Sequence, residues 1–510
     1  MPQPIILDGS LTWRQVSEVA EGAPLALGAA AQSRIRAARA LVDSIVAKGV
    51  RAYGVNTGVG ALCDVVIPQS KLEQLSRNIV MSHAVGLGPP LEAPAVRAII
   101  AAAINNFAHG FSGVRPAVVE GLLALLGHDC IPEVPSRGSV GYLTHMAHIA
   151  LVLLGAGRAR LLDRPMSGAE ALEAMHLAPL VLASKEGLSL VNGTPCATGL
   201  AAIALARTQR LLDWADVVAA MTFENLRGQI AVFDADAVGL RVSAGVAEVG
   251  ERLRALLSGS GILRESAGRR TQDPLSLRAV PQVHGAVRDL HAHAGRVVDD
   301  ELGSVTDNPA VAGTAHEPRA LSGAQAVGAA LGLTMDSLAV AAAELAAMSE
   351  RRVDRLVNPL LSGLPAFLAT DDGTGSGFMI AQYTAVSLVA DNRRLAAPAS
   401  LDGGVTSGLQ EDHLSHATPG ALKLLQIIDN AESIVAIELL AAVQAYELQR
   451  DGCARAAQTD AVYRRVRGLV PQFRDDRPLS ADIRTARELL RRPPPDLCAA
   501  AHAESSDRLL

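Results

Sequence analysis

The sequence predicts a mainly α-helical protein with a long central helical bundle and a smaller N-terminal region. Hydrophobic residues make up 49% of the 510 residues and aromatic residues only 3%, so alanine, leucine, valine and isoleucine must build the core. Because alanine carries the lowest cost in a helix, this composition favours closely packed helices. Long stretches in which apolar residues recur every three or four positions favour the same fold class, and strand-like alternation is rare.

The N-terminal region, residues 1–197, reads as helices that glycine and proline interrupt. Trp13 to Gly49 and Lys71 to Gly127 are helical segments, and a glycine-rich loop at 54–60 separates them. Tyr53 directly precedes this loop, so its side chain can reach a bound ligand.

The central region, residues 198–450, is predicted to be the helical bundle. Its long apolar stretches are Gln325–Val353, Tyr383–Arg394 and Pro419–Tyr446. They are too apolar for single surface helices, so we expect inner helices of a bundle or of a subunit interface. The first stretch has the clearest helical spacing of apolar residues, at Leu331, Met335, Leu338, Ala342, Leu345 and Met348.

The C-terminal region, residues 451–510, changes in character. It is rich in arginine and contains the run Arg491-Arg492-Pro493-Pro494-Pro495. We expect it to form a peripheral helical cap.

Charge and hydropathy exclude several classes of protein. The net charge is −6, which is small for this length and gives no basis for nucleic-acid binding. Met1 to Ser10 lacks the basic start and apolar run of a signal peptide. The longest uncharged runs, Gly138–Gly157 and Gly187–Ala206, have the length of a membrane span, but their glycines and polar residues indicate buried segments of a soluble protein.

The cysteines show neither metal-ligand spacing nor a disulfide framework, which suits a reducing cytoplasm. They are odd in number and widely scattered, at Cys63, Cys130, Cys196, Cys453 and Cys498.

Several short motifs, taken together and in order, resemble the aromatic amino acid lyase family of histidine and phenylalanine ammonia-lyases. The Ser82-His83 pair is the version found in the histidine-specific members. The resemblance implies a mainly helical homotetramer whose active sites are shared between subunits. The motifs are Tyr53–Gly60, Met81–Gly86, Lys185–Leu188, Asn192–Thr194, Gln272–Pro274, Ser276–Arg278, Pro281–Val283, Ser304–Pro309, Ser349–Arg352, Leu361–Pro365 and Gln410–His413.

The segment that forms the prosthetic group in this family departs from the pattern. In the family, Gly-Ser-Val-Gly is followed by an Ala-Ser-Gly triplet that cyclises to a methylidene-imidazolone electrophile, and then by Asp-Leu-Ala-Pro. Here Tyr142 follows Gly141 directly, and the family's Asp and Pro correspond to Tyr142 and His145. The sequence therefore predicts a degenerate cofactor segment and no cofactor.

Tyr53 and Arg278 are the strongest candidates for chemistry. By the resemblance, Tyr53 abstracts the β-proton, although it could instead be a loop tyrosine that packs on the core. A phenol needs nearby positive charge or hydrogen-bond donors to ionise at neutral pH. Arg278 has the guanidinium fork that suits a substrate carboxylate, although it could instead pair with Asp273.

Asn192, Gln272, His83 and Glu411 match further residues of the family's active site. Asn192 and Gln272 would line the site as amides, or could be caps or turn residues. His83 and Glu411 would face the side chain of the substrate. The alternatives are a satisfied helix histidine and a buried ion pair that involves Asp412 or His413.

Other departures lie near these positions. Leu275 stands where the family has a tyrosine, and Gln325-Ala326-Val327 replaces an Asn-Phe-His segment. Tyr142, His145 and His284 are then candidate substrate-binding residues. His145 and His148 lie three apart on an expected helix, but a lone pair at this spacing does not predict a metal site.

These departures predict a cytoplasmic lyase or hydratase that works without the methylidene-imidazolone. Tyr53 would abstract a proton that an adjacent carboxyl group acidifies, and Arg278 would stabilise the resulting enolate. The substrate would be a small carboxylate or enoate, with neither nucleic acid nor membrane as partner. One alternative is an inactive homologue that serves as a binding or scaffold protein. The second is an ordinary aromatic amino acid ammonia-lyase, if a modified triplet has dropped out of the written sequence after Gly141.

Overall fold

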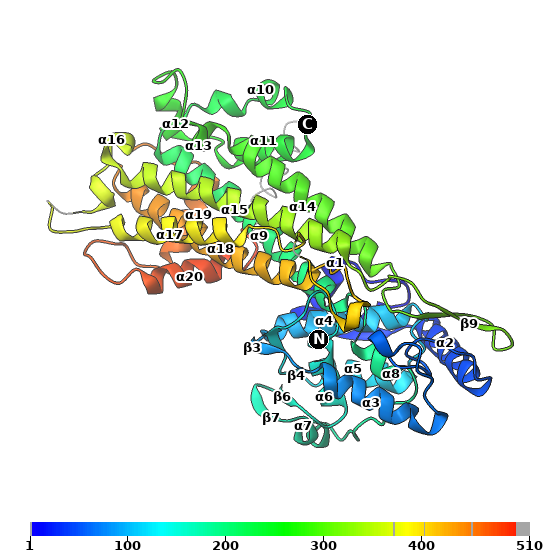
Figure 1. The fold of residues 1–510 in the computed structure, drawn as a ribbon. Coiled ribbons are helices and arrows are strands. Elements are labelled where there is room, and N and C mark those ends of the chain that lie inside the picture. Colours follow the sequence, from blue (N-terminus) through cyan, green and yellow to red (C-terminus); the bar gives the residue numbers. More distant parts are fainter. Residues whose placement is uncertain (1–2, 371–372, 402, 450–451, 496–510) are drawn as a thin grey trace, which may run out of the picture. The chain divides into compact units, whose positions relative to one another are not determined.

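The computed structural model describes residues 3–370, 373–401, 403–449 and 452–495. The fold is mainly helical, as the sequence predicts (Figure 1). The chain divides into two compact units, each assembled from separate stretches. The first unit is 1–206, 294–336 and 398–422, and the second is 207–293, 337–397 and 423–510. The division into regions 1–197, 198–450 and 451–510 stays a prediction, and part of its last region lies outside the described residues.

The first unit combines short helices with small β-sheets. The expected helical segments are present, and the glycine-rich loop lies between α2 and α3. The helices within this unit are α1 (Trp13–Ala20), α2 (Ala29–Ala47), α3 (Leu72–His83), α4 (Ala93–Ala108), α5 (Pro116–Gly127), α6 (Thr144–Leu153), α7 (Gly168–Ala174) and α8 (Glu186–Val191), with the 3-10 helices η1 (Gly60–Leu62), η2 (Gln69–Lys71) and η5 (Ser407–Leu409).

The strands of this unit are short and pair locally. β1 and β2 are parallel, and the other pairs are antiparallel: β3 with β5, β6 with both β4 and β7, and β8 with β9. Their bounds are β1 Ile5–Leu7, β2 Leu25–Leu27, β3 Leu87–Pro90, β4 Cys130–Pro132, β5 Pro135–Arg137, β6 Arg158–Leu161, β7 Arg164–Ser167, β8 Ala310–Gly313 and β9 Pro318–Leu321.

Four long helices contribute residues to both units: α9 (Pro195–Asn225), α14 (Val280–Leu302), α15 (Ala329–Val357) and α18 (Ala417–Glu447). The remaining helices belong to the second unit. They are α10 (Ala235–Gly239), α11 (Ala244–Leu256), α12 (Gly261–Ser266), α13 (Leu275–Arg278), α16 (Pro359–Ser362), α17 (Met379–Leu395), α19 (Ala457–Arg467) and α20 (Ser480–Leu490), with the 3-10 helices η3 (Ile230–Phe233) and η4 (Ala366–Leu368).

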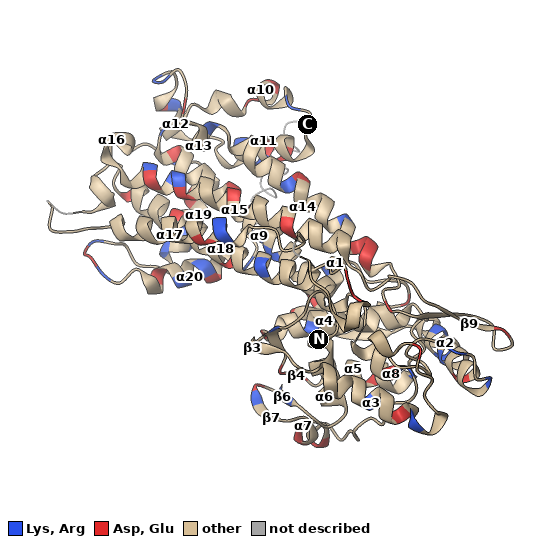
Figure 2. Cartoon of the chain, viewed as in Figure 1, with Lys and Arg blue, Asp and Glu red and all other residues tan. Residues whose placement is uncertain are grey.

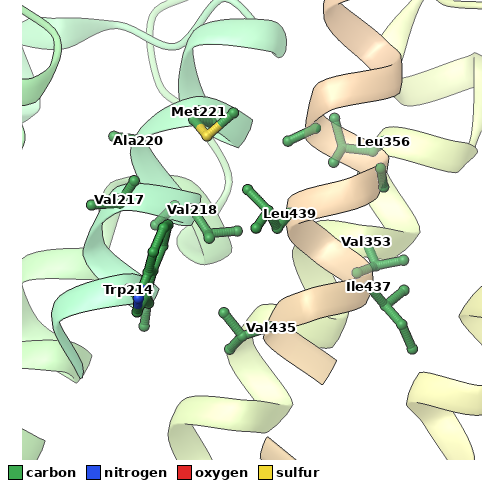
Figure 3. Packing of buried hydrophobic residues seen from close by; sticks show 14 of the residues in the cluster. Trp214, Val217, Val218, Ala220, Met221, Val353, Leu356, Val435, Ile437 and Leu439 are labelled. Carbon is green, nitrogen blue, oxygen red and sulfur yellow. The ribbon is translucent and has the colours of Figure 1, made fainter. Parts of the chain in front are cut away.

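The core of the second unit is apolar and closely packed. In α15 the apolar residues that predicted the helix are buried, from Leu331 at 0% exposed to Met348 at 8%. Removal of this area from water is the main driving term for folding. Figure 3 shows part of the cluster, with Trp214, Val217, Val218, Ala220, Met221, Val353, Leu356, Val435, Ile437 and Leu439 labelled.

Buried ion pairs link the core helices. Arg352 of α15 donates to Glu438 of α18 at 2.6 and 2.9 Å, and neither side chain is exposed. Outside the core, acidic and basic residues are interspersed along the helices (Figure 2). Within the described residues, the stretches Glu186–Asn225 and Ala329–Val357 have the length and hydropathy of membrane spans, but 94% and 61% of their most apolar windows are buried in the fold. The buried core helices of a protein can meet the same criteria of length and hydropathy.

Candidate active site

A cavity of about 710 Å³ lies in the first unit, and every residue that lines it belongs to that unit. This volume falls in the range that small-molecule sites occupy. Five of the predicted site residues line it together, although they are far apart in the sequence. They are Tyr53, His83, Tyr142, Asn192 and Glu411.

Tyr53 enters the cavity from the loop before η1. The Gly60 N–H donates to the Tyr53 hydroxyl at 3.2 Å, so the loop turns back on its own tyrosine. Gly60 has a φ of +58°, and a Cβ there would lie 3.3 Å from Cβ of Ser407, so glycine lets η1 approach η5. Burial raises the pKa of Tyr53 above its usual value, the Gly60 N–H opposes this, and the nearby Glu411 adds to the rise.

Tyr142 and Glu411 meet across the cavity wall. The Tyr142 hydroxyl donates to Oε2 of Glu411 at 2.6 Å. Burial and then this hydrogen bond raise the pKa of Tyr142 well above its usual value, so its hydroxyl keeps its proton. The alternative of a buried ion pair that involves Asp412 or His413 is not formed among the described residues, and the Tyr142 hydroxyl is what holds the Glu411 side chain.

The loop before Tyr142 does not fit the family's prosthetic group. Its serine, Ser139, accepts from the Gly141 N–H at 3.0 Å and donates to the Tyr142 carbonyl at 2.9 Å. Gly141 has a φ of +141°, and a Cβ there would lie 2.6 Å from Oγ of Ser415. Ser139 stands between Gly138 and Val140, so residues 138–143 do not supply the Ala-Ser-Gly triplet.

Asn192 ends α8 and is fixed in the lining. Its side-chain N–H donates to the carbonyl of Asn308 at 2.7 Å, and Asn308 also lines the cavity. At the residue before Asn308, Asp307 accepts from Lys185 at 2.9 Å, and both side chains are fully buried. This buried ion pair therefore joins α8 to the segment that carries Asn308.

His83 ends α3, and burial lowers its pKa. Among the described lining residues there is no lysine or arginine, whereas Glu411 and Asp412 both contribute carboxylates. Within one chain the cavity is therefore acidic, and it favours a ligand that carries an ammonium group or N–H donors.

Two predicted residues, Gln272 and Arg278, belong to the second unit and do not line this cavity. Gln272 is exposed. The alternative pairing of Arg278 with Asp273 is not formed, because Asp273 pairs with Arg270 at 3.1 Å. Nε of Arg278 is buried without a hydrogen-bond partner among the described residues.

Of the three histidines predicted to bind substrate, His83 lines the cavity, and the other two lie elsewhere. His145 is buried in α6, and burial lowers its pKa to about 4. His284 lies in the core of the second unit, where Nδ1 is 2.8 Å from Asp216. Burial alone would raise the pKa of Asp216, but Arg288 and then His284 lower it to about 2. This geometry gives no support to a substrate-binding role for either histidine, which stays a prediction.

Sequence reasoning gave no role to several lining residues. The cavity is also lined by Cys63, Asn308, Asp412 and His413. The only feature of the sequence that could have identified them as site residues is their position in or beside the family motifs. Ala326 and Val327 also line it, so the segment that replaces Asn-Phe-His is part of the site. No cluster of potential metal ligands is found in the part of the chain that the structure describes.

Comparisons with known proteins extend over nearly the whole chain. The model of the aromatic amino acid lyase family matches residues 11–468. A histidine ammonia-lyase of Anaeromyxobacter sp. (strain K) is 44% identical over 502 residues, which cover 95% of this chain and 98% of the relative.

Solved structures agree with this result. The histidine ammonia-lyase of Trypanosoma cruzi has a TM-score of 0.88 at 36% identity, covering 96% of this chain and 93% of that one. The tyrosine aminomutase of Streptomyces globisporus has a TM-score of 0.90 at 34% identity, covering 96% and 97%.

The prediction of an electrophile-independent lyase or hydratase acting on a carboxylate or enoate is therefore wrong. The similarity to histidine ammonia-lyases over nearly the full length overturns it and favours the second alternative, an ordinary ammonia-lyase. On the family model and these relatives together, the chain belongs to the aromatic amino acid lyase family.

Proposed function

We propose that the chain is an amino acid ammonia-lyase that acts on histidine or on an amino acid with a similarly polar ring. The observation that carries the proposal is the cavity itself, in which Tyr53 lies among Glu411, Asp412 and His83 with no described lysine or arginine in the lining. An amino acid brings an ammonium group, and a histidine ring also brings an N–H donor. Both complement this lining.

In the proposed reaction Tyr53, as phenolate, removes a proton from the β-carbon. The electrons of the C–H bond form the carbon–carbon double bond, and the C–N bond breaks with its electron pair on nitrogen. Ammonia leaves, takes the proton from Tyr53 and restores the phenolate, and the other product is the unsaturated acid. Residues 138–143 do not supply the family's electrophile. In an ordinary ammonia-lyase a triplet after Gly141 would form this group, and it would supply the activation that elimination of ammonia needs.

The other residues are proposed to bind and orient the substrate. Glu411 and His83 face the ring, and Asn192, which Asn308 holds at 2.7 Å, presents its amide to the amino acid end. Arg278 binds the carboxylate. It lies outside the cavity lining of its own chain and has no ion pair among the described residues, so another copy of the chain would supply it.

The proposed assembly is a soluble, cytoplasmic homotetramer. On α17, Ile380, Tyr383 and Val386 are 57%, 66% and 45% exposed, and their spacing places them on one face. An exposed apolar helix face of this kind is typical of a subunit interface.

The test is ammonia release by the purified full-length protein, measured together with the ultraviolet absorbance of the unsaturated acid. We expect turnover of histidine and little or none of phenylalanine and tyrosine. Intact mass of the same preparation determines whether the chain carries a triplet after Gly141. A folded protein that releases no ammonia from any of these amino acids overturns the proposal, whatever its mass.

A further inference from the structure

The hydrogen bond between Tyr142 and Glu411 joins two loops that are far apart in the sequence. The two residues are separated by 269 positions, and their 2.6 Å bond is formed at the cavity wall. Tyr142 is 6% exposed, while Glu411 is half-buried, so the carboxylate stays accessible to a ligand.

Both loops are held by further bonds, so the Tyr142 hydroxyl has a defined position. The His416 N–H donates to the Val140 carbonyl at 2.9 Å, and the Thr418 hydroxyl donates to the Gly141 carbonyl at 3.1 Å. On the other side, the Thr406 N–H donates to the backbone carbonyl of Glu411 at 2.8 Å. The backbones are thus fixed without any contribution from the Glu411 side chain.

The Glu411 side chain depends on Tyr142 alone. Oε2 accepts from Tyr142, and Oε1 has no hydrogen-bond partner among the described residues. Within its own chain, no described lysine or arginine of the lining competes for this carboxylate. One oxygen is anchored and the other is free to accept from a ligand.

We propose that Tyr142 is a positioning residue for ring recognition, which anchors one oxygen of Glu411 so that the other accepts the N–H of a substrate ring. The inference rests on the proposed function, and it extends that function to a residue that departs from the family's pattern. Because the carboxylate is already ordered in the free protein, the entropy cost of fixing it does not fall on ligand binding.

The experiment measures binding, so it does not depend on turnover. Histamine and phenethylamine differ only in the ring, and calorimetric titration of the full-length protein gives the ratio of their dissociation constants. We expect the wild type to prefer histamine. Tyr142→Phe should reduce the preference about tenfold or more, which corresponds to the lower end of the range for a hydrogen bond to a charged group.

A double-mutant cycle separates positioning from direct contact. In the Glu411→Gln background, Tyr142→Phe should change the ring preference by less than about twofold, because Tyr142 acts through the Glu411 carboxylate. If the two substitutions reduced the ring preference independently, so that the double variant showed the product of the two single losses, the inference would be overturned. An unchanged ring preference in Tyr142→Phe would overturn it as well. An inactive wild type with an intact histamine preference would instead count against the proposed function alone.

Tyr463→Phe is the matched control. It removes a tyrosine–glutamate hydrogen bond of 3.0 Å, to Glu447, in the second unit. This variant should keep the wild-type ring preference. Tyr142→Phe is isosteric and leaves a half-buried carboxylate that water can solvate, and its melting temperature confirms that it is folded. Loss of ring preference in the control as well would overturn the inference, because the effect would then be structural.

Discussion

Tyr53 must ionise before it can accept a proton, and its surroundings within one chain oppose this. Burial raises its pKa above 10.0, and Glu411 raises it further, while only the Gly60 N–H acts in the opposite direction. The missing stabilisation has to come from positive charge. The substrate ammonium brings one such charge, and Arg278 of another copy would bring a second.

Tyr53→Phe should therefore abolish most of the turnover and leave substrate binding largely intact. We expect kcat to fall by roughly two to four orders of magnitude, the usual loss for a general base, with little change in KM. Because the phenolate fraction grows with pH up to the raised pKa, kcat/KM of the wild type should rise between about pH 7 and 10. Steady-state kinetics measure both effects.

In Tyr53→Phe, kcat/KM should no longer rise with pH, because the variant has no phenol to ionise. Wild-type-like turnover in Tyr53→Phe would remove Tyr53 as the base.

His145 makes the protein sensitive to acid. Its pKa in the fold is about 4, against 6.5 without the fold, because burial disfavours the charged imidazolium. Because the unfolded chain binds the proton more readily, the free energy of unfolding has its full value above about pH 7 and falls as the pH drops toward 4. At pH 5 the loss should be about 2 kcal/mol in the free energy of unfolding.

Urea denaturation at about pH 7.5 and 5 measures this difference, and His145→Leu should remove most of it. His316→Leu is the control, because His316 is exposed. An equal loss on acidification in wild type and His145→Leu would contradict the prediction.

At the scale of elements, the helices follow from the sequence because their spacing has a direct physical meaning. The apolar residues that gave α15 its period, from Leu331 to Met348, had to be buried on one face, and they are, whereas Leu333 and Val340 are 56% and 53% exposed. The start of this helix was less predictable. It begins at Ala329 rather than Gln325, because residues 322–327 form a loop along the cavity.

The loops of the site could be found only by resemblance. Leu143, Ser407 and Leu409 adopt φ values of +77°, +51° and +75°, although none of them is glycine. No sequence pattern signals such conformations, because tertiary contacts stabilise them. The pairing of Tyr142 with Glu411 was unpredictable for the same reason.

The buried ion pair of Lys185 with Asp307 joins α8 to the segment that carries Asn308, and its contribution to stability can be tested. Lys185→Met leaves Asp307 as a buried carboxylate without its cation, which should cost about 3–5 kcal/mol in the free energy of unfolding. Lys185→Met combined with Asp307→Asn should recover part of this loss. Chemical denaturation of the two variants checks the prediction, and a single variant as stable as wild type would contradict it.

At the scale of the whole molecule, the exposed face of α17 and the division of the predicted site favour a multi-chain enzyme. Tyr53, His83, Asn192 and Glu411 line one cavity, while Gln272 and Arg278 belong to the second unit and do not line it. All of these residues lie in the family motifs, so the sequence predicted them. The order of the motifs along one chain does not determine which chain supplies each residue to a site.

Complementation between two inactive variants tests whether Tyr53 and Arg278 come from different chains. Tyr53→Phe and Arg278→Met should each be nearly inactive as homotetramers, the second with a raised KM because it loses the carboxylate anchor. In mixed tetramers some sites combine an intact Tyr53 from one chain with an intact Arg278 from another. Random assembly of equal amounts should restore about a quarter of the wild-type activity.

Co-expression of the two variants with different affinity tags, followed by tandem purification, yields the mixed species, and light scattering verifies its mass. The control co-expresses two differently tagged copies of Tyr53→Phe, which cannot complement. If both residues came from the same chain, every site would carry one of the two substitutions and the mixture would stay inactive. A mixture as inactive as its parents would therefore show that the site is not shared, and that Arg278 reaches it within one chain or not at all.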